Sequence, residues 1–232
     1  VLAAGELLAL GTDTSPGIGP LMIVDIGGAT TDIHSYIQQE PYHGARIVGT
    51  PEEFAKRTVE GDLGMRESSG TLRQEMGFGV LEAATGLSST TVDKILARWN
   101  HERSSLATSQ EERSVDDALA KGAVRISARR HAGRVERVLA AGVERIQRGK
   151  NLRGIDTIIG TGGVLVSHPT PAELLAQVCS DLGENDTLLP EQASCLIDAE
   201  YTLYAAGLLS LKHRDVALRL MRRSLRPVGM TT

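Results

Sequence analysis

The chain has 232 residues, of which 41% are hydrophobic and 23% charged, an ordinary balance for a globular protein able to bury a core. A formal net charge of −4 gives no overall attraction to nucleic acid or to an anionic membrane. The two cysteines do not suggest a disulfide framework, and no apolar run reaches the ~20 residues of a membrane span. We therefore predict a cytoplasmic protein without nucleic-acid or membrane partners.

The first elements lead to an apolar strand. Residues 1–10 read as the end of a helix with small residues on one face, and residues 11–20 as a Gly- and Pro-rich loop. The apolar run that starts at Leu21 predicts a buried strand. It leads into the turn Asp25-Ile26-Gly27-Gly28-Ala29-Thr30-Thr31-Asp32, after which a second strand begins.

This turn is the first candidate site. A hairpin here brings Asp25 and Asp32 to the same open end of two paired strands. Gly27 and Gly28 allow a ligand to approach the backbone closely. Free N–H groups with the hydroxyls of Thr30 and Thr31 suit phosphate oxygens, and the two acids suit hydrated magnesium. The alternative is an ordinary Gly-Gly hairpin with solvated acids.

The next segment predicts mostly helices. Residues 46–48 are a candidate short strand, and Thr50-Pro51-Glu52-Glu53 predicts a capped helix that continues to about Val59. Residues 64–113 contain scattered Gly and Ser and few strand signals, and they predict an inserted helical subdomain with a helix over about 91–102. The apolar face of that helix consists of Val92, Ile95, Leu96 and Trp99.

A long helix is predicted from Ser114 to as far as Gln147. Its buried side would carry Leu119, Ala123, Ile126, Val135, Val138, Gly142 and Ile146. Its other side carries Lys121, Arg125, Arg129, Arg130, Arg134 and Arg137. A basic helix can follow nucleic-acid phosphates, but acids interrupt this one and the whole chain is acidic, which favours a solvated face.

A second glycine turn follows a second apolar strand. Residues 155–159 predict a buried strand that runs into Gly160-Thr161-Gly162-Gly163 and a short helix. Such a turn leaves room for a base or sugar beside the backbone, or for a phosphate at the helix start. The alternative is a tight strand–helix corner that needs glycine for steric reasons only. The full dinucleotide pattern is missing.

The remaining elements are mostly helical. Thr170-Pro171-Ala172-Glu173 predicts another helix start, and Leu188-Leu189-Pro190 a short strand or its entry. Asp198 is expected to cap a helix over 199–211, residues 215–225 to form a basic amphipathic helix, and residues 226–232 to fray. None of the six histidines has zinc-site spacing, and His34 is expected to be a partnered structural residue.

Taken together, the two glycine turns resemble a known superfamily. Asp25 to Asp32 resembles the second phosphate motif of the actin–Hsp70–sugar kinase ATPases, with Ala29 in place of a third glycine. Gly160 to Gly163 looks like the adenosine motif, and the helix around 205–207 is similar to the small-residue helix at the hinge between lobes. With Gly49-Thr50-Pro51 and residues 58–66, nearly the whole chain resembles the MutL family of glutamate mutase accessory proteins.

The resemblance implies an α/β fold. It is an actin-like (ribonuclease H-like) ATPase lobe, with a mixed sheet flanked by helices and an inserted, mainly helical subdomain. The lobe would comprise residues 1–39 and 114–226, the inserted subdomain 40–113, and a flexible tail 227–232. The first phosphate motif of the superfamily does not occur in these residues. We therefore expect a C-terminal lobe that needs an N-terminal lobe and hydrolyses ATP poorly by itself.

The resemblance also implies a function. The full-length protein would be a chaperone-like, reactivase-like ATPase that serves adenosylcobalamin-dependent glutamate mutase, with ATP and Mg²⁺ as cofactors. Asp25 and Asp32 would position magnesium and the attacking water, Gly27, Gly28, Thr30 and Thr31 the phosphates, and Gly160, Thr161, Gly162 and Gly163 the adenosine. A small-molecule kinase of the same superfamily and an actin-like filament protein are the alternatives.

Overall fold

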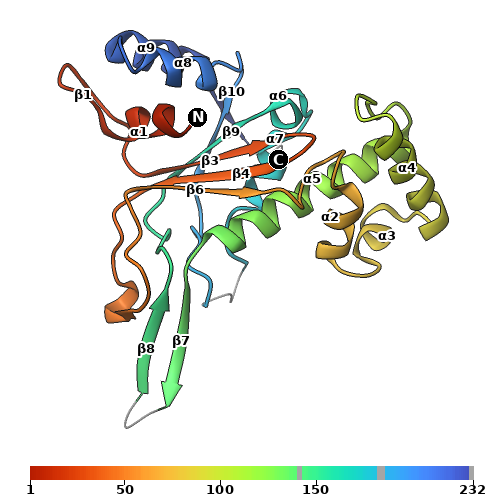
Figure 1. Ribbon diagram of the computed structural model, residues 1–232, viewed down its shortest axis with the longest axis horizontal. Coiled ribbons are helices and arrows are strands. Elements are labelled where there is room, and N and C mark those ends of the chain that lie inside the picture. The colour runs from red at the N-terminus through yellow and green to blue at the C-terminus, as the bar shows by residue number, and fades with distance from the viewer. Residues whose placement is uncertain (140–142, 182–185, 230–232) are drawn as a thin grey trace.

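The computed structural model describes residues 1–139, 143–181 and 186–229. Helices in these ranges are α1 (Leu2–Leu10), α2 (Ser69–Met76), α3 (Val80–Thr85), α4 (Ser89–His101), α5 (Gln110–His131), α6 (Gly163–Ser167), α7 (Pro171–Ala176), α8 (Leu203–Leu209) and α9 (Arg214–Ser224), with a 3₁₀ turn at Tyr42–Gly44 (Figure 1). The strands are β1 (Gly11–Thr12), β2 (Ser15–Pro16), β3 (Leu21–Ile26), β4 (Thr31–Tyr36), β5 (Arg46–Ile47), β6 (Ala55–Glu60), β7 (Arg134–Leu139), β8 (Val143–Arg148), β9 (Thr157–Thr161), β10 (Ser194–Asp198) and β11 (Leu225–Val228).

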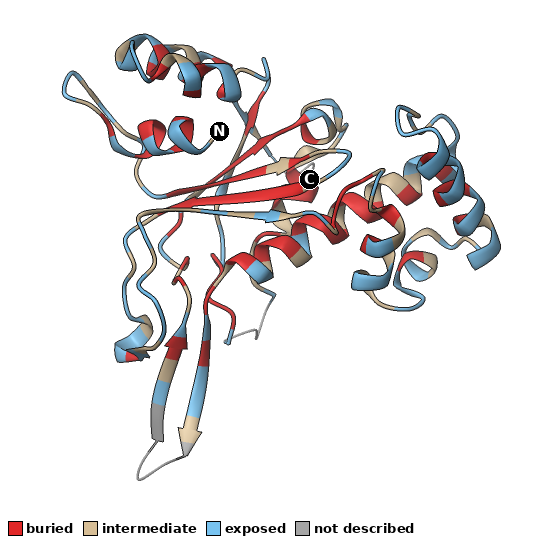
Figure 2. Cartoon of the chain, viewed as in Figure 1, coloured by how far each residue is buried: buried red, intermediate tan, exposed pale blue. Residues whose placement is uncertain are grey.

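The body of the molecule is a mixed sheet, as predicted for an α/β fold. Its strand order is β11-β10-β9-β3-β4-β6. Strand β9 runs parallel to both β3 and β10, and the other neighbours are antiparallel. Helices cover both faces of the sheet, and Figure 2 shows the buried residues concentrated in the central strands. None of the described helices combines the length and the apolar character needed to cross a membrane.

The continuous apolar run of β3 is explained by burial on both faces. Met22 and Val24 belong to a core formed with α5, whereas Leu21 and Ile23 belong to a second core with α1, α8 and α9. Alternate side chains of a strand point to opposite faces, so a strand covered on both sides needs apolar residues at every position.

The predicted helix over residues 50–59 is wrong. Its second half is β6, the edge strand that pairs with β4. Backbone groups of the first half are bound elsewhere: the Glu52 N–H donates to Gln39 Oε1 at 2.7 Å. Lys150, which is fully buried, donates from Nζ to the carbonyls of Glu53 at 2.6 Å and Phe54 at 2.7 Å. These tertiary contacts outweigh a local capping signal worth about 1 kcal/mol.

The predicted helix to Gln147 is also wrong beyond residue 131. Helix α5 starts earlier than expected, with Ser109 and Glu112 forming a capping box, and ends at His131. The Gly133 N–H then donates to the Lys150 carbonyl at 2.7 Å, and the chain turns into the β7–β8 hairpin. Gly142, predicted on the buried side of this helix, lies outside the described residues.

Residues 69–101 form three helices beside the N-terminal half of α5, away from the main sheet (Figure 1). Helix α4 confirms the predicted helix and its apolar face, because Val92, Ile95, Leu96 and Trp99 are all buried. The domain boundaries themselves stay a prediction; β6, within the range 40–113, belongs to the main sheet.

The basic side of α5 is covered by acids. Arg125 and Arg129 contact Asp181, and Lys121 contacts Asp117 and Glu173. Arg130 contacts Glu60, Asp62 and Glu75. These ion pairs compensate much of the positive charge of this helix face, whereas Arg134 and Arg137, predicted on the same face, lie on β7.

The C-terminal third differs from the prediction in its strands. Asp198 ends the unpredicted strand β10, and its carboxylate accepts N–H bonds from Thr202 and Leu203 at 3.0 and 2.9 Å, so α8 starts later than expected. Residues 225–228 form β11 instead of fraying. Leu188-Leu189-Pro190 lies outside any described strand.

Helices α1 and α9 are confirmed, and α1 packs on α8 where Ala4 meets Gly207.

Candidate functional site

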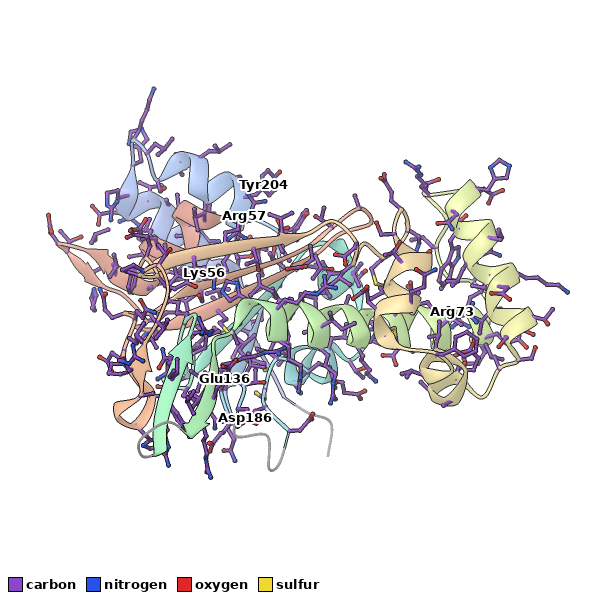
Figure 3. The ribbon with its side chains drawn as sticks, turned by 60° about the horizontal axis from the view of Figure 1, so that its bottom comes forward. Lys56, Arg57, Arg73, Glu136, Asp186 and Tyr204 are labelled. Atoms are coloured by element: carbon purple, nitrogen blue, oxygen red, sulfur yellow. The ribbon has the colours of Figure 1, made fainter. Side chains whose placement is uncertain are left out.

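The β3–β4 hairpin brings the two predicted acids together. Asp25 and Asp32 are direct partners in its register. Asp32 Oδ2 lies 2.7 Å from Nη2 of Arg57, a residue of β6 that Figure 3 labels. The Oδ1 atom of Asp32 is buried and has no hydrogen-bond partner among the described residues. Burial and, to a lesser degree, the charge of Asp32 raise the pKa of Asp25. Two carboxylates with unused acceptor capacity suit a cation that keeps most of its water.

The turn between these acids is closed by its own backbone. The Gly27 N–H donates to the Thr30 carbonyl at 2.9 Å. The Thr31 hydroxyl donates to the Leu63 carbonyl at 2.8 Å and is fully buried, so it is already engaged within the protein. Gly28 and Ala29 are exposed, and their N–H groups have no acceptor in the described part of the chain. These N–H groups are the donors left for an anion.

Gly28 is not required by the protein's own packing. Its φ is not positive, and a Cβ at this position would meet only Arg66 Cβ and Cγ, both at 3.8 Å, which is ordinary contact. A glycine that neither the backbone conformation nor the packing demands is one that leaves space for a ligand.

The second glycine turn touches the first. Strands β3 and β9 are parallel, with Asp25 opposite Thr161, so both turns lie at the same end of the sheet. Gly162, at φ 89°, follows β9 and precedes α6, and a Cβ there would lie 2.5 Å from both Asp25 Oδ1 and the Ile26 carbonyl oxygen. Gly160 and Thr161 are buried within the sheet, and the Thr161 hydroxyl donates to Asp198 Oδ2 at 3.1 Å.

A cavity of about 710 Å³ opens beside both turns. Gly27, Gly28 and Gly163 form one wall, and the start of α5 with the preceding loop forms another. Its polar lining comes from segments far apart in the sequence: Arg66, Arg103, Arg113, Asp116, Asp117 and His168. None of these residues was predicted, because no local pattern indicates that residues 103–117 meet the two turns.

Several charged groups of this cavity are already paired. Arg66 Nη1 lies 2.7 Å from Asp116 Oδ1, and its guanidinium lies 4.3 Å from the centroid of the Trp99 ring. His168 Nε2 lies 3.4 Å from Asp117 Oδ1, and this hydrogen bond, followed by that of Lys121, lowers the pKa of Asp117. Arg103 also pairs with Glu67 at 3.0 Å, and Arg113 Nη1 donates to the Thr108 carbonyl at 2.9 Å. The wall that keeps unused donors is therefore the glycine backbone.

His34 shares the strand face of Asp32 but does not match its prediction. It is buried, and neither ring nitrogen has a hydrogen-bond partner among the residues that the structure describes. Burial, followed by the nearby charge of Arg57, lowers the pKa of His34 to about 3, so the ring is neutral. Within the same described ranges, no three His, Cys, Asp or Glu residues are placed to hold a metal.

Comparison with known proteins gives two matches. A family model described as MutL protein matches residues 1–225. A curated relative, "Protein MutL" of Clostridium tetanomorphum, is 41% identical over 229 residues, which cover 97% of this chain and 49% of the relative. The chain thus spans about half the length of the curated relative that it matches.

Proposed function

We propose that this chain, which belongs to the MutL protein family, is the ATP-binding lobe of an accessory ATPase. The client would be adenosylcobalamin-dependent glutamate mutase, which the full-length protein would keep active as a chaperone. The observation that carries the proposal is the contact between the two glycine turns, with the acid pair at their junction and a cavity of about 710 Å³ beside them.

The sheet supports the proposed actin-like fold. A hairpin with acids at its open end lies next to a parallel strand that ends in the second glycine turn. Helices cover both sheet faces, and α1 and α8 cross through small residues at Ala4 and Gly207. These are the features that the sequence resemblance leads us to expect.

Each residue has a distinct part in this proposal. The exposed N–H groups of Gly28 and Ala29 and the Thr30 hydroxyl would hold phosphate oxygens, and the cavity bordered by Gly163 would hold the nucleoside. Asp25 and the free Oδ1 of Asp32 would bind magnesium through its water shell and orient the attacking water. Bound magnesium would neutralise charge on the phosphates. Gly162 would position Asp25, and the engaged Thr31 hydroxyl would fix the turn.

Gly28 allows a test that separates ligand binding from folding. In the full-length protein, we expect Gly28→Ala to leave the free energy of unfolding within about 0.5 kcal/mol, the ordinary range for a surface change. ATP affinity in calorimetric titration should nevertheless fall at least tenfold, because the new methyl group occupies the ligand's approach. Unchanged affinity would contradict the phosphate role of this turn.

The acids are tested by turnover. We expect Asp25→Asn and Asp32→Asn, each in the full-length protein, to lower ATP hydrolysis at least tenfold, because a neutral amide holds hydrated magnesium less well. Asp93→Asn is the matched control, since Asp93 lies on α4 and pairs with Arg73. Near-normal turnover in both acid variants would refute the assignment.

A further inference from the structure

Arg57 brings a positive charge to the open end of the β3–β4 hairpin. It lies on β6, beside β4, and its direct cross-strand partner is His34. Its guanidinium extends two positions further toward the hairpin end, where it contacts Asp32. Direct partners in a sheet project from the same face, and so do residues two apart on one strand. Arg57, Asp32 and Asp25 therefore share the sheet face on which α1 packs.

The ion pair between Arg57 and Asp32 is suited to exchange. The side chain of Arg57 is 48% exposed, whereas that of Asp32 is 12% exposed. An ion pair with one partner this open to water is weak, because solvent screens it and the arginine loses side-chain entropy in holding it. Under the proposed function, Asp32 also binds hydrated magnesium. The charge that Arg57 now balances would then be balanced by the metal, and the guanidinium would be released.

Two other arginines beside the glycine turns do not have this freedom. Arg66 pairs with Asp116 at 2.7 Å, and Arg103 pairs with Glu67 at 3.0 Å. Neither acidic partner has a part in the proposed magnesium site, so metal binding gives these arginines no reason to leave. Arg57 differs from them because its partner is one of the two proposed metal-binding acids.

The proposed reaction needs a cation from outside the hairpin. ATP is a polyanion, and Asp25 and Asp32 place two further carboxylates beside it. In phosphoryl transfer, cationic groups stabilise the charge that spreads over the oxygens of the transferred phosphoryl group. The turn from Asp25 to Asp32 contains acids, glycines and threonines but no basic residue. Arg57, on the next strand, is the side-chain cation in contact with the acid pair in the part of the chain that the structure describes.

We propose that Arg57 is a further catalytic residue of the ATPase, an inference that rests on the proposed function. It holds Asp32 before nucleotide binds, and it turns to the γ-phosphate once the acid pair holds magnesium. In the hydrolysis step, the water oxygen bonds to the γ-phosphorus, and the bond to the β–γ bridging oxygen breaks with its electron pair on ADP. A carboxylate of the acid pair accepts the water's proton, and Arg57 neutralises charge on the γ-phosphate oxygens.

Lys56 supplies a matched control. It precedes Arg57 on β6 and therefore projects from the opposite face, where its ammonium contacts Glu52; Figure 3 labels both basic residues. Lys56→Gln and Arg57→Gln remove the same charge from the same strand. In the full-length protein, we expect Arg57→Gln to lower kcat for ATP hydrolysis about tenfold or more and Lys56→Gln to change it by about twofold or less. Arg57→Lys, which keeps the charge, should retain more turnover than Arg57→Gln.

Metal affinity separates this role from a merely structural one. The probe is Mn²⁺ in place of Mg²⁺, titrated into the nucleotide-free full-length protein, with the free ion measured by electron paramagnetic resonance. If Arg57 only held Asp32 in place, Arg57→Gln would weaken Mn²⁺ binding. Under the proposal, the guanidinium competes with the metal for Asp32, so Arg57→Gln should tighten Mn²⁺ binding about threefold or more, beyond any change in Lys56→Gln.

Three results would overturn the proposal. They are equal turnover in Arg57→Gln and Lys56→Gln, weaker Mn²⁺ binding in Arg57→Gln than in Lys56→Gln, and turnover of Arg57→Lys no higher than that of Arg57→Gln. The unchanged protein distinguishes this failure from failure of the proposed function. If it hydrolyses ATP and Arg57→Gln matches the control, only the role of Arg57 is wrong. If it neither binds nor hydrolyses ATP, the proposed function is wrong and this inference with it.

Discussion

Replacing Gly162 by alanine is expected to disturb both glycine turns at once. The residue has φ 89° and ψ 150°, a region open almost only to glycine. A Cβ would also lie 2.5 Å from Asp25 Oδ1 and from the Ile26 carbonyl oxygen, and 3.0 Å from the Ile26 nitrogen. Backbone atoms of a central strand cannot move away as a flexible side chain can, so the strain cannot be relieved cheaply.

The magnitude follows from two contributions. Holding a non-glycine residue in this backbone region costs about 1–3 kcal/mol. Overpacking a tight site adds about 1–3 kcal/mol. We therefore expect Gly162→Ala to lower the free energy of unfolding by about 2–6 kcal/mol, at the upper end of what single substitutions do.

Urea unfolding measures this directly, with Gly163→Ala as the control. Gly163 is the first residue of α6, its φ is not positive, and a Cβ there would have no heavy atom within 4 Å. The control should therefore change the unfolding free energy by about 1 kcal/mol or less, with alanine the better helix residue. If Gly162→Ala were as stable as Gly163→Ala, the described contact between the two turns would be wrong.

Three further predictions concern buried and stacked groups. The pKa of His34 is about 3 in the folded protein and about 6.5 in the unfolded chain, so the free energy of unfolding should fall as the pH drops from 6.5 toward 3. His34→Leu should flatten that part of the pH–stability curve, and an unchanged slope would contradict a buried, neutral ring. Burial is the main cause that lowers the pKa of Lys150 from 10.5 to about 8, so the free energy of unfolding should rise between pH 8 and 10.5. Lys150→Met should remove this rise, and a variant that kept it would show that the ammonium is solvated. Arg66→Gln should destabilise the region of helices α2–α4 by about 1–2 kcal/mol, because it removes the contacts of Arg66 with Trp99 and Asp116. The unfolding transition can be followed by the fluorescence of Trp99, the single tryptophan of the chain, and an unchanged transition would refute the stacked geometry.

Two similar helix-start patterns show which part of the secondary structure could be predicted from the sequence. Thr50-Pro51-Glu52-Glu53 and Thr170-Pro171-Ala172-Glu173 share one pattern, yet only the second starts a helix, α7. Leu174 and Leu175 in α7 and Val178 just after its end recur at helical spacing, and all three are buried. In β6 partly buried and exposed positions alternate, which suits an edge strand. The capping residues alone therefore did not decide the structure; the apolar period that follows them did.

The candidate site was predictable to a similar extent. The acid pair and both glycine turns depend on short contiguous motifs, and the hairpin register places Asp25 opposite Asp32 as expected. The opposite wall of the cavity, with Arg103 and Arg113, depends on how residues 103–117 pack against the turns. Long-range packing of this kind leaves no local pattern. Likewise, the buried acceptor of the Thr31 hydroxyl lies more than thirty residues away, at Leu63.

The segment 65–67, which leads into helices α2–α4, is attached to the first glycine turn by main-chain hydrogen bonds, and this limits how the sequence there can vary. The carbonyl of Gly27 accepts the Met65 N–H at 3.2 Å, and that of Gly28 accepts the N–H groups of Arg66 and Glu67 at 2.8 and 2.9 Å. All three bonds join main-chain atoms, so they do not depend on which side chains occupy positions 65–67. A changed side chain leaves these three bonds in place, although Met65 is buried and Arg66 contacts Asp116 and Trp99, whereas a proline at any of the three removes a donor. An inserted or deleted residue would shift all three donors together. The number of residues in this segment should therefore be tightly constrained.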